Sequence, residues 1–145
     1  MADIACIMRL IAVGLIFCMM ALGNASAEAQ LRGHGGPIRA LAISADGATA
    51  LSGSFDTSAI RWSLRRDTAE QVLRFHKGAV DAVAILADGR AVTAGEDTRI
   101  ALWTPGKQEP DRVLEGHHEP IVALAVSPDG ATLASASWDL SLIHI

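Results

Sequence analysis

Cysteine is nearly absent from this chain of 145 residues, which holds only Cys6 and Cys18. Beyond position 18 there is therefore no CxxC redox pair, no CxxCH haem-attachment motif and no cysteine-based zinc site. The sequence also lacks GxSxG, a phosphate-binding loop and HExxH. These absences argue against the hydrolases, nucleotide-binding enzymes and zinc peptidases that such motifs identify.

Clusters of basic residues are missing as well. The chain has 12 Lys and Arg against 16 Asp and Glu, a formal net charge of -4, and its only adjacent basic pair is Arg65-Arg66. We expect that pair to lie in a solvated turn. Because nucleic acids are bound through basic patches, this composition argues against nucleic acid as the main partner.

No hydrophobic run is long enough to span a membrane comfortably. The run from Leu10 to Leu22 has 13 uncharged residues, whereas a membrane helix needs about 20. Arg9 precedes this run and Ala25-Ser-Ala27 follows it, an arrangement typical of a secretory signal peptide. We therefore predict a signal peptide over residues 1–27, cleaved after Ala27. A retained amino-terminal anchor is the alternative.

Cleavage at this point predicts a periplasmic or secreted chain, residues 28–145, without a membrane segment. Both cysteines leave with the signal peptide, so no disulfide can form in the mature chain. Asn24, the only asparagine, leaves as well. Lipidation at Cys18 is not expected, because Phe17 stands where a lipoprotein site needs a small residue.

What the sequence does contain is a repeat. Three histidines, 42 and 41 residues apart, are each followed by an aspartate after 22, 21 and 22 residues: His34 and Asp56, His76 and Asp97, His117 and Asp139. Self-similarity at about 40–45 residues indicates a repeat architecture rather than an ordinary globular core.

Each copy reads as four short strands. An alternating apolar segment is followed by an Asp-Gly turn, a second strand, a third strand, a polar loop and a fourth strand, and turn signals at this spacing predict an antiparallel sheet. The expected strands after the alternating segments are 48–54, 58–64, 72–75, 90–96, 99–104, 112–115 and 131–137, with a polar loop over 65–71. Ala29–Gly33 matches the register of Arg112–Gly116 and is expected to be the last strand of one unit. No long helix is expected after residue 27, and neighbouring sheets must stack to bury their faces.

At these residues the chain resembles the WD40 family of β-propellers. The resemblance covers Glu28 to Asp139, and its motifs are Gly33-His34, Gly116-His117, Ser127-Pro-Asp-Gly130, Trp138-Asp139 and the strand-end Trp62 and Trp103. It implies an all-β fold of about two and three-quarter WD40 blades, each of four antiparallel strands, over about 34–75, 76–116 and 117–145. Because a propeller typically has 4–8 blades, we expect an incomplete ring and an amino-terminal fragment of a longer protein. The ending Leu140–Ile145 departs from the family strand, so whether it is natural sequence stays open.

The resemblance also implies a hydrogen-bonded tetrad of histidine, Ser or Thr, aspartate and tryptophan in each blade. These tetrads are His34, Ser52, Asp56 and Trp62; His76, Thr93, Asp97 and Trp103; and His117, Ser135 and Asp139, with Ile145 in place of the third tryptophan. The chemistry is sound by itself, since a buried carboxylate needs donors and a neutral imidazole offers one donor and one acceptor. Phe75 replaces the glycine that precedes the histidine, which puts the local turn of the second blade in question.

Two other interpretations of these residues are set aside. Histidines at equivalent positions of separate blades cannot converge on one metal ion. A Ser-His-Asp set that occurs three times indicates a structural device, since a hydrolase needs one triad. We therefore expect no catalytic residue, metal or cofactor.

In this family the partner surface is usually the ring face that carries the loops before the first strand and between the second and third. The positions concerned lie three and five residues after the histidine and one before the aspartate: Pro37, Arg39 and Phe55; Ala79, Asp81 and Glu96; Pro120, Val122 and Trp138. Large exposed aromatics are favoured anchors of protein contacts, so Phe55 and Trp138 are the leading candidates. The alternative is that they pack against the adjacent blade.

Together these features predict a non-catalytic, exported WD40 scaffold that binds a protein partner through the propeller face. An alternative is the propeller portion of a longer periplasmic redox protein, with a c-type cytochrome domain beyond residue 145. A third is a small-molecule sensor. The identity of the partner and the total number of blades stay open.

Overall fold

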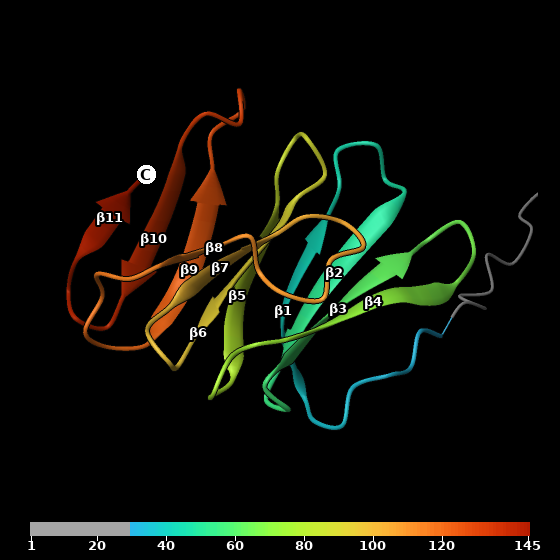
Figure 1. Ribbon diagram of the computed structural model, residues 1–145, viewed down its shortest axis with the longest axis horizontal. Helices are drawn as coiled ribbons and strands as arrows, with labels where there is room; N and C mark the ends of the chain where they lie inside the picture. The colour runs from blue at the N-terminus through green and yellow to red at the C-terminus, as the bar shows by residue number, and fades with distance from the viewer. Residues whose placement is uncertain (1–29) are drawn as a thin grey trace, which may run out of the picture. The chain divides into compact units, whose positions relative to one another are not determined.

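Short strands joined by tight turns make up the regular structure of the computed structural model, which describes residues 30–145 (Figure 1). The predicted signal peptide lies outside the described residues. The strands are β1 (Ile38–Ile43), β2 (Thr49–Ser54), β3 (Ser58–Ser63), β4 (Thr68–Arg74), β5 (Val80–Ile85), β6 (Ala91–Gly95), β7 (Ile100–Trp103), β8 (Arg112–Leu114), β9 (Ile121–Val126), β10 (Leu133–Ser137) and β11 (Leu142–His144).

These strands form three antiparallel sheets, in the orders β1-β2-β3-β4, β5-β6-β7-β8 and β11-β10-β9. The described residues contain no helix, and hence none that is long and apolar enough to cross a membrane. The three sheets do not close into a ring. The prediction of an all-β fold built from incomplete propeller blades is confirmed.

Two expected strand positions were wrong. β4 starts at Thr68 rather than at residue 72, because its pairing with β3 continues past a bulge at Arg61/Trp62 to Ser63. The polar residues of this stretch are compatible with a strand because Thr68, Ala69 and Glu70 are exposed. Residues 30–33 form no strand, since no sheet of the described chain pairs with them.

Asp-Gly turns join the first two strands of each sheet. In the first, Gly47 has a φ of 67°, and Asp46 accepts the amide hydrogen of Ala48 at 3.0 Å. Gly89 and Gly130 repeat this backbone, with φ values of 85° and 71°. Glycine fits here because positive φ strains residues that carry a Cβ.

The apolar core lies between neighbouring sheets. Leu51 and Leu73 of the first sheet pack with Val80 and Trp103 of the second, while Val92 and Ile100 of the second pack with Ile121 of the third. The first strands β1, β5 and β9 contact one another in order, and Figure 1 shows the sheets following one another from β4 to β11. Each sheet thus buries a face only because the next sheet covers it.

Polar side chains also join the first two sheets. The Arg61 guanidinium donates to the carbonyl of Gly89 at 2.8 Å. The buried amide of Gln71 accepts from the backbone of Gly106 at 3.1 Å and donates to the carbonyl of Lys107. These bonds fix the order and spacing of the sheets, and hence the positions of the loops at their ends.

One apolar face of the first sheet has no neighbouring sheet in the described chain. Ile38, Leu41 and Ile43 of β1 are 57%, 66% and 59% exposed. Their counterparts on β5 include Val80, which is fully buried against the first sheet, and Val83 and Ile85, which pack against the same cluster. The difference follows from stacking, because the sequence pattern of the two strands is the same.

Candidate functional site

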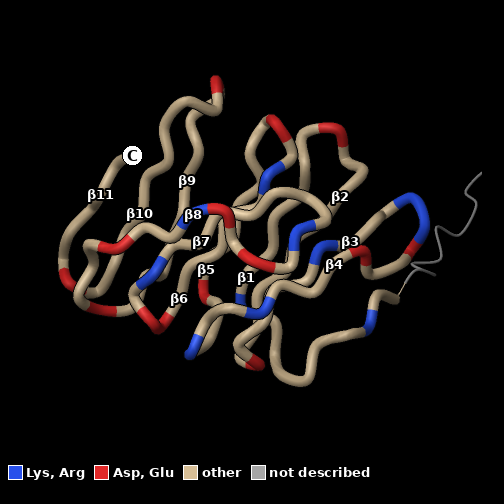
Figure 2. Tube along the Cα trace, in the orientation of Figure 1, with Lys and Arg blue, Asp and Glu red and all other residues tan. Residues whose placement is uncertain are grey.

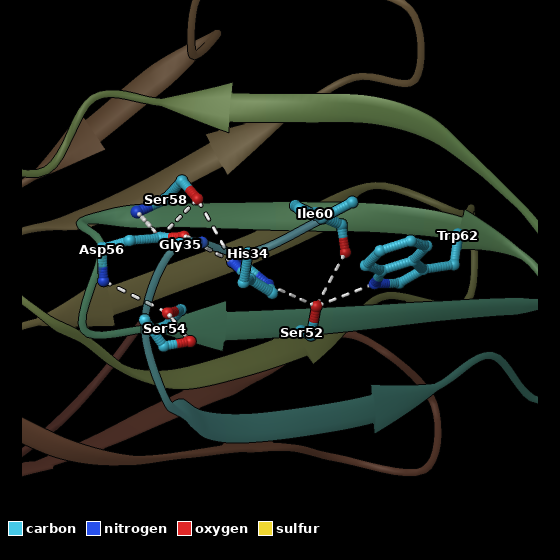
Figure 3. A network of polar contacts seen from close by, with 9 residues as sticks. His34, Gly35, Ser52, Ser54, Asp56, Ser58, Ile60 and Trp62 are labelled. Atoms are coloured by element: carbon cyan, nitrogen blue, oxygen red, sulfur yellow. Dashed lines mark hydrogen bonds and ion pairs between the residues drawn. The ribbon is translucent and has the colours of Figure 1, made fainter. Parts of the chain in front are cut away.

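In each of the first two sheets four side chains form a hydrogen-bonded set, and the third sheet holds three of the four. Each set starts at the end of the sheet where the histidine-containing loop meets the turn between the second and third strands. We call this end the loop face: the loops that start at His34, His76 and His117, together with the β2–β3, β6–β7 and β10–β11 turns. The second strand supplies the hydroxyl, the turn supplies the aspartate, and the third strand supplies the tryptophan. Figure 3 shows this arrangement in the first sheet.

In the first sheet the four residues form a continuous chain of hydrogen bonds. Asp56 Oδ2 lies 3.1 Å from His34 Nδ1, and Ser52 Oγ lies 2.7 Å from His34 Nε2. The indole Nε1 of Trp62 donates to Ser52 Oγ at 2.8 Å. Ser52 and Trp62 are buried, and the His34 side chain is only 4% exposed.

The second sheet repeats this geometry with threonine as the hydroxyl. His76 lies 2.8 Å from both Asp97 Oδ1 and Thr93 Oγ1, and Trp103 Nε1 donates to Thr93 at 2.9 Å. Phe75 does not disturb the turn: its ring packs edge-on against His76 and Trp103, with centroids 5.4 and 6.3 Å apart. An aromatic side chain therefore adds to the packing around this histidine.

The third sheet has the first three members. His117 lies 2.9 Å from Asp139 Oδ2 and 2.8 Å from Ser135 Oγ. Ile145 exchanges two backbone hydrogen bonds with Leu133, which places it in the register that Trp62 holds opposite Ala50. Because isoleucine has no donor, Ser135 lacks the indole hydrogen bond that its two counterparts receive.

The donors and acceptors assign a direction to each chain. An ionised carboxylate only accepts, so the histidine Nδ1–H donates to it, and the neutral ring then presents Nε2 as an acceptor. The hydroxyl donates to Nε2 and accepts the indole N–H. In the first two sheets each chain therefore runs from tryptophan through hydroxyl and imidazole to the carboxylate, and in the third sheet it starts at the hydroxyl of Ser135.

Further donors hold the aspartates ionised. Burial opposes ionisation of Asp56, but hydrogen bonds from Ser58, Gly35 and His34 outweigh it and keep the pKa of this carboxyl below its usual range. The hydroxyl of Ser141, at 2.6 Å, lowers the pKa of Asp139 most, and His117 adds to the effect.

Asp97 has fewer such donors. Burial raises the pKa of Asp97, but the hydrogen bonds from His76 and from the Lys77 amide, at 3.1 Å, lower it by more, so the pKa lies below its usual range. Arg99 replaces the serine that follows the other two aspartates by two positions, and only its backbone donates, at 3.4 Å. Ser58 and Ser141 were missed in the sequence, although the Asp-x-Ser spacing that the two copies share was a usable signal.

This geometry gives the hydroxyls no access to substrate. Ser52, Thr93 and Ser135 are 1%, 0% and 1% exposed. Among residues 30–145 no group of three or more histidine, cysteine, aspartate or glutamate side chains could hold a metal ion. The polar chains therefore act as internal supports of the loop face.

The structure brings the candidate partner residues together in pairs. The residue before each aspartate donates its backbone N–H to the residue three after each histidine: Phe55 to Pro37 at 3.1 Å, Glu96 to Ala79 at 3.0 Å, and Trp138 to Pro120 at 3.1 Å. Ala79 is buried, whereas Pro37, Phe55, Glu96 and Trp138 are exposed. Three equivalent positions thus present phenylalanine, glutamate and tryptophan to solvent.

The first strands place Arg39, Asp81 and Val122 at equivalent positions of adjacent sheets. Arg39 donates to Asp81 at 3.0 Å, and its guanidinium carbon lies 5.0 Å from the centre of the Phe55 ring. The Asp81 side chain is only 8% exposed. Phe55 therefore makes a cation–π contact within the first sheet, with the arginine that bridges to the second sheet.

Comparison with known proteins supports this arrangement. A sequence profile described as "WD domain, G-beta repeat" matches residues 26–63, 68–104 and 108–143. Each matched segment starts before one of the three histidines and ends at or near the third strand of the same sheet. The three matches cover most of the chain.

Similar curated proteins include "Cilia- and flagella-associated protein 52" of Chlamydomonas reinhardtii, 31% identical over 113 residues, 77% of this chain and 18% of that protein. "Guanine nucleotide-binding protein subunit beta-2" of Caenorhabditis elegans is 41% identical over 46 residues, 32% of this chain and 12% of that protein. "Coronin-7" of Bos taurus is 46% identical over 61 residues, 37% and 7% respectively. The chain spans less than a fifth of the length of these relatives.

Exchanging Thr93 for valine tests the polar chain of the second sheet. Thr93→Val keeps the shape of the side chain but leaves His76 and Trp103 without their shared hydroxyl, and each unpaired buried group costs about 1–3 kcal/mol. We expect the free energy of unfolding to fall by about 2–4 kcal/mol in urea titrations. Thr68→Val, at an exposed site on β4, is the matched control and should change stability by less than about 0.5 kcal/mol. Equal effects of the two variants would contradict the assigned role.

Acid should destabilise the chain through its aspartates. Because folding lowers the pKa of Asp97, its stabilising contribution is present above the unfolded value of about 3.9 and is lost as the pH falls below that value. Asp97→Asn should therefore lower stability at pH 7 and flatten the decline in unfolding free energy between about pH 5 and pH 3. Glu109→Gln, in an exposed loop, controls for the lost charge. A decline as steep in Asp97→Asn as in the control would exclude this mechanism.

Proposed function

This chain belongs to the WD40-repeat family, and we propose that it is an exported, non-catalytic scaffold that binds a protein partner through its loop face. WD40 repeats form propeller domains that commonly mediate protein interactions, which supports the binding role. Two of the relatives are named as a subunit and as an associated protein of larger assemblies, in line with such a role. Export rests on the signal-peptide pattern of residues 1–27.

The observation that carries the proposal is the exposure of the residues before the three aspartates. Phe55 is 47% exposed and Trp138 is 68% exposed, and Glu96 is exposed as well. Phe55 and Glu96 each have a following sheet beside them, yet neither is buried by it. At these two positions a neighbouring sheet leaves the side chain exposed, which favours a contact role for the aromatics over packing against an adjacent blade.

The chemistry of these residues suits protein recognition. Tryptophan and arginine are among the residues that contribute most to binding energy at interfaces. Trp138 stands on a turn held by its own backbone bond to Pro120, and Arg39 is held by Asp81. Side chains on a rigid frame lose little conformational freedom on binding, which favours affinity.

Replacement of both aromatics tests the binding role. The full-length protein, immobilised, should capture a defined set of proteins from an extract of its own host, and Phe55→Ala/Trp138→Ala should lose that set. The melting temperature should change by less than about 4 °C, because exposed substitutions are nearly neutral.

The control is Leu41→Ala/Ile43→Ala, which removes two exposed apolar side chains away from the loop face. Proteins that adhere to any apolar surface should decrease with this variant, whereas true partners should be retained. Capture that survives loss of Phe55 and Trp138 argues against the proposal, and so does a large fall in melting temperature, which would assign the aromatics to packing.

Export can be tested separately. Protein recovered from the host outside the cytoplasm should begin at Glu28, as read by amino-terminal sequencing. Replacing Ala25 and Ala27 with bulky residues should block cleavage, so the mass of the recovered protein should be larger by the mass of the signal peptide. An unprocessed amino terminus on the wild-type protein in the cytoplasmic fraction would refute export.

A further inference from the structure

The two most exposed apolar side chains of the loop face lie at its third sheet. Trp138 is 68% exposed and Leu140 is 98% exposed, both on the β10–β11 turn. Val122, in the paired strand β9, is 38% exposed. We call these three residues the apolar tip. Isolated exposed apolar residues are ordinary, but three on adjoining segments indicate a contact surface.

Carboxylates flank the apolar tip. Glu119 is exposed and is held beside Trp138, because the Ser137 hydroxyl donates to the Glu119 carbonyl at 2.8 Å and Trp138 N–H donates to the adjacent Pro120. Glu96 occupies the position of Trp138 in the neighbouring sheet. Asp139 follows Trp138 directly and stays ionised through its hydrogen bonds with Ser141 and His117. Figure 2 shows acidic residues at the loop ends of β6, β9 and β10.

The nearby cations are largely engaged elsewhere. Arg39 pairs with Asp81, and Arg99 pairs with Glu115 at 3.1 Å. Lys77 is the cation of the second histidine-containing loop. Near the loop face of the second and third sheets, three cations, Arg39, Lys77 and Arg99, thus stand against six carboxylates: Asp81, Glu96, Asp97, Glu115, Glu119 and Asp139. The potential around the apolar tip is therefore negative.

We propose, on the basis of the proposed binding role, that the apolar tip takes a partner segment that carries an apolar side chain flanked by lysine or arginine. Such a segment matches both features at once: its apolar side chain covers Trp138 and Leu140, and its cations lie opposite Glu119 and Glu96. Opposite charges at the rim favour encounter and discriminate against acidic partners.

Tryptophan fluorescence reports directly on this surface. Of the three tryptophans, Trp62 and Trp103 are 4% and 1% exposed, and only Trp138 faces solvent. A segment that covers Trp138 should shift its emission to shorter wavelength, while the buried pair should not respond.

The probes are three synthetic peptides without aromatic residues. The first has one leucine flanked by lysines in a serine background, the second has glutamate in place of the lysines, and the third has glycine in place of the leucine. The full-length protein should bind the first at least about tenfold more tightly than the other two, since several rim pairs of about 0.2–1 kcal/mol each act together. Raising NaCl from about 0.1 to 1 M, which shortens the Debye length from ~10 to ~3 Å, should weaken binding several-fold.

Glu96→Gln/Glu119→Gln should weaken binding of the first peptide by about three- to tenfold and remove most of its salt dependence. The matched control, Asp67→Asn/Glu109→Gln, removes two exposed carboxylates from loops at the opposite end of the sheets and should change nothing. Equal or tighter binding of the glutamate peptide, or no response of Trp138 to any peptide, would overturn the inference. Either result would overturn the proposed partner chemistry only. The binding role itself is tested separately, by the capture experiment with Phe55→Ala/Trp138→Ala.

Discussion

The hydrogen-bonded chain from carboxylate to imidazole to hydroxyl is the interaction on which the loop face depends. In each chain the aspartate belongs to the turn after the second strand and the hydroxyl to the second strand itself. The imidazole bonds to both and so ties them to the loop ahead of the first strand. A buried polar group without a partner is costly, so removing one member of a chain should weaken the sheet that contains it. In residues 30–145 every buried side-chain nitrogen and oxygen has a partner. The loops are therefore positioned by polar chemistry, while the apolar clusters hold the sheets together.

The apolar clusters set the order of the sheets and thereby align their loop faces. Leu51 packs across the first sheet interface and Ile121 across the second, so β1, β5 and β9 lie in sequence. Arg39 and Asp81 meet only because this packing places equivalent positions of adjacent sheets side by side. A surface composed of single residues from separate repeats is thus produced by stacking, and no one sheet could form it alone.

The repeat allowed most of the fold to be predicted from sequence, because its period, its Asp-Gly turns and its alternating segments occur in three copies. The early start of β4 was not predictable from the pattern, because Thr68 and Glu70 are polar and the stretch is a strand only through its pairing with β3. The support of Asp56 comes from Ser58, a small polar residue of a type that usually indicates a loop. The bridge from Gln71 to the next sheet joins residues far apart in the sequence, so no local pattern could predict it. Exposure of Trp138 also required the structure, because burial is a property of neighbours rather than of residue type.

The three copies of the repeat can be compared with one another within a single chain. Histidine, a hydroxyl residue and aspartate occur in all three, while the residue before the aspartate is Phe55, Glu96 or Trp138. The histidine, hydroxyl and aspartate are constant because their polar atoms satisfy one another in the interior, whereas the residue before the aspartate can vary because its side chain is exposed to solvent. The aspartate fixes the turn, and the fixed turn orients the adjacent side chain outward. An internal support and an exposed side chain are therefore consecutive residues, so the exposed residue can change without loss of the hydrogen bonds that support the turn.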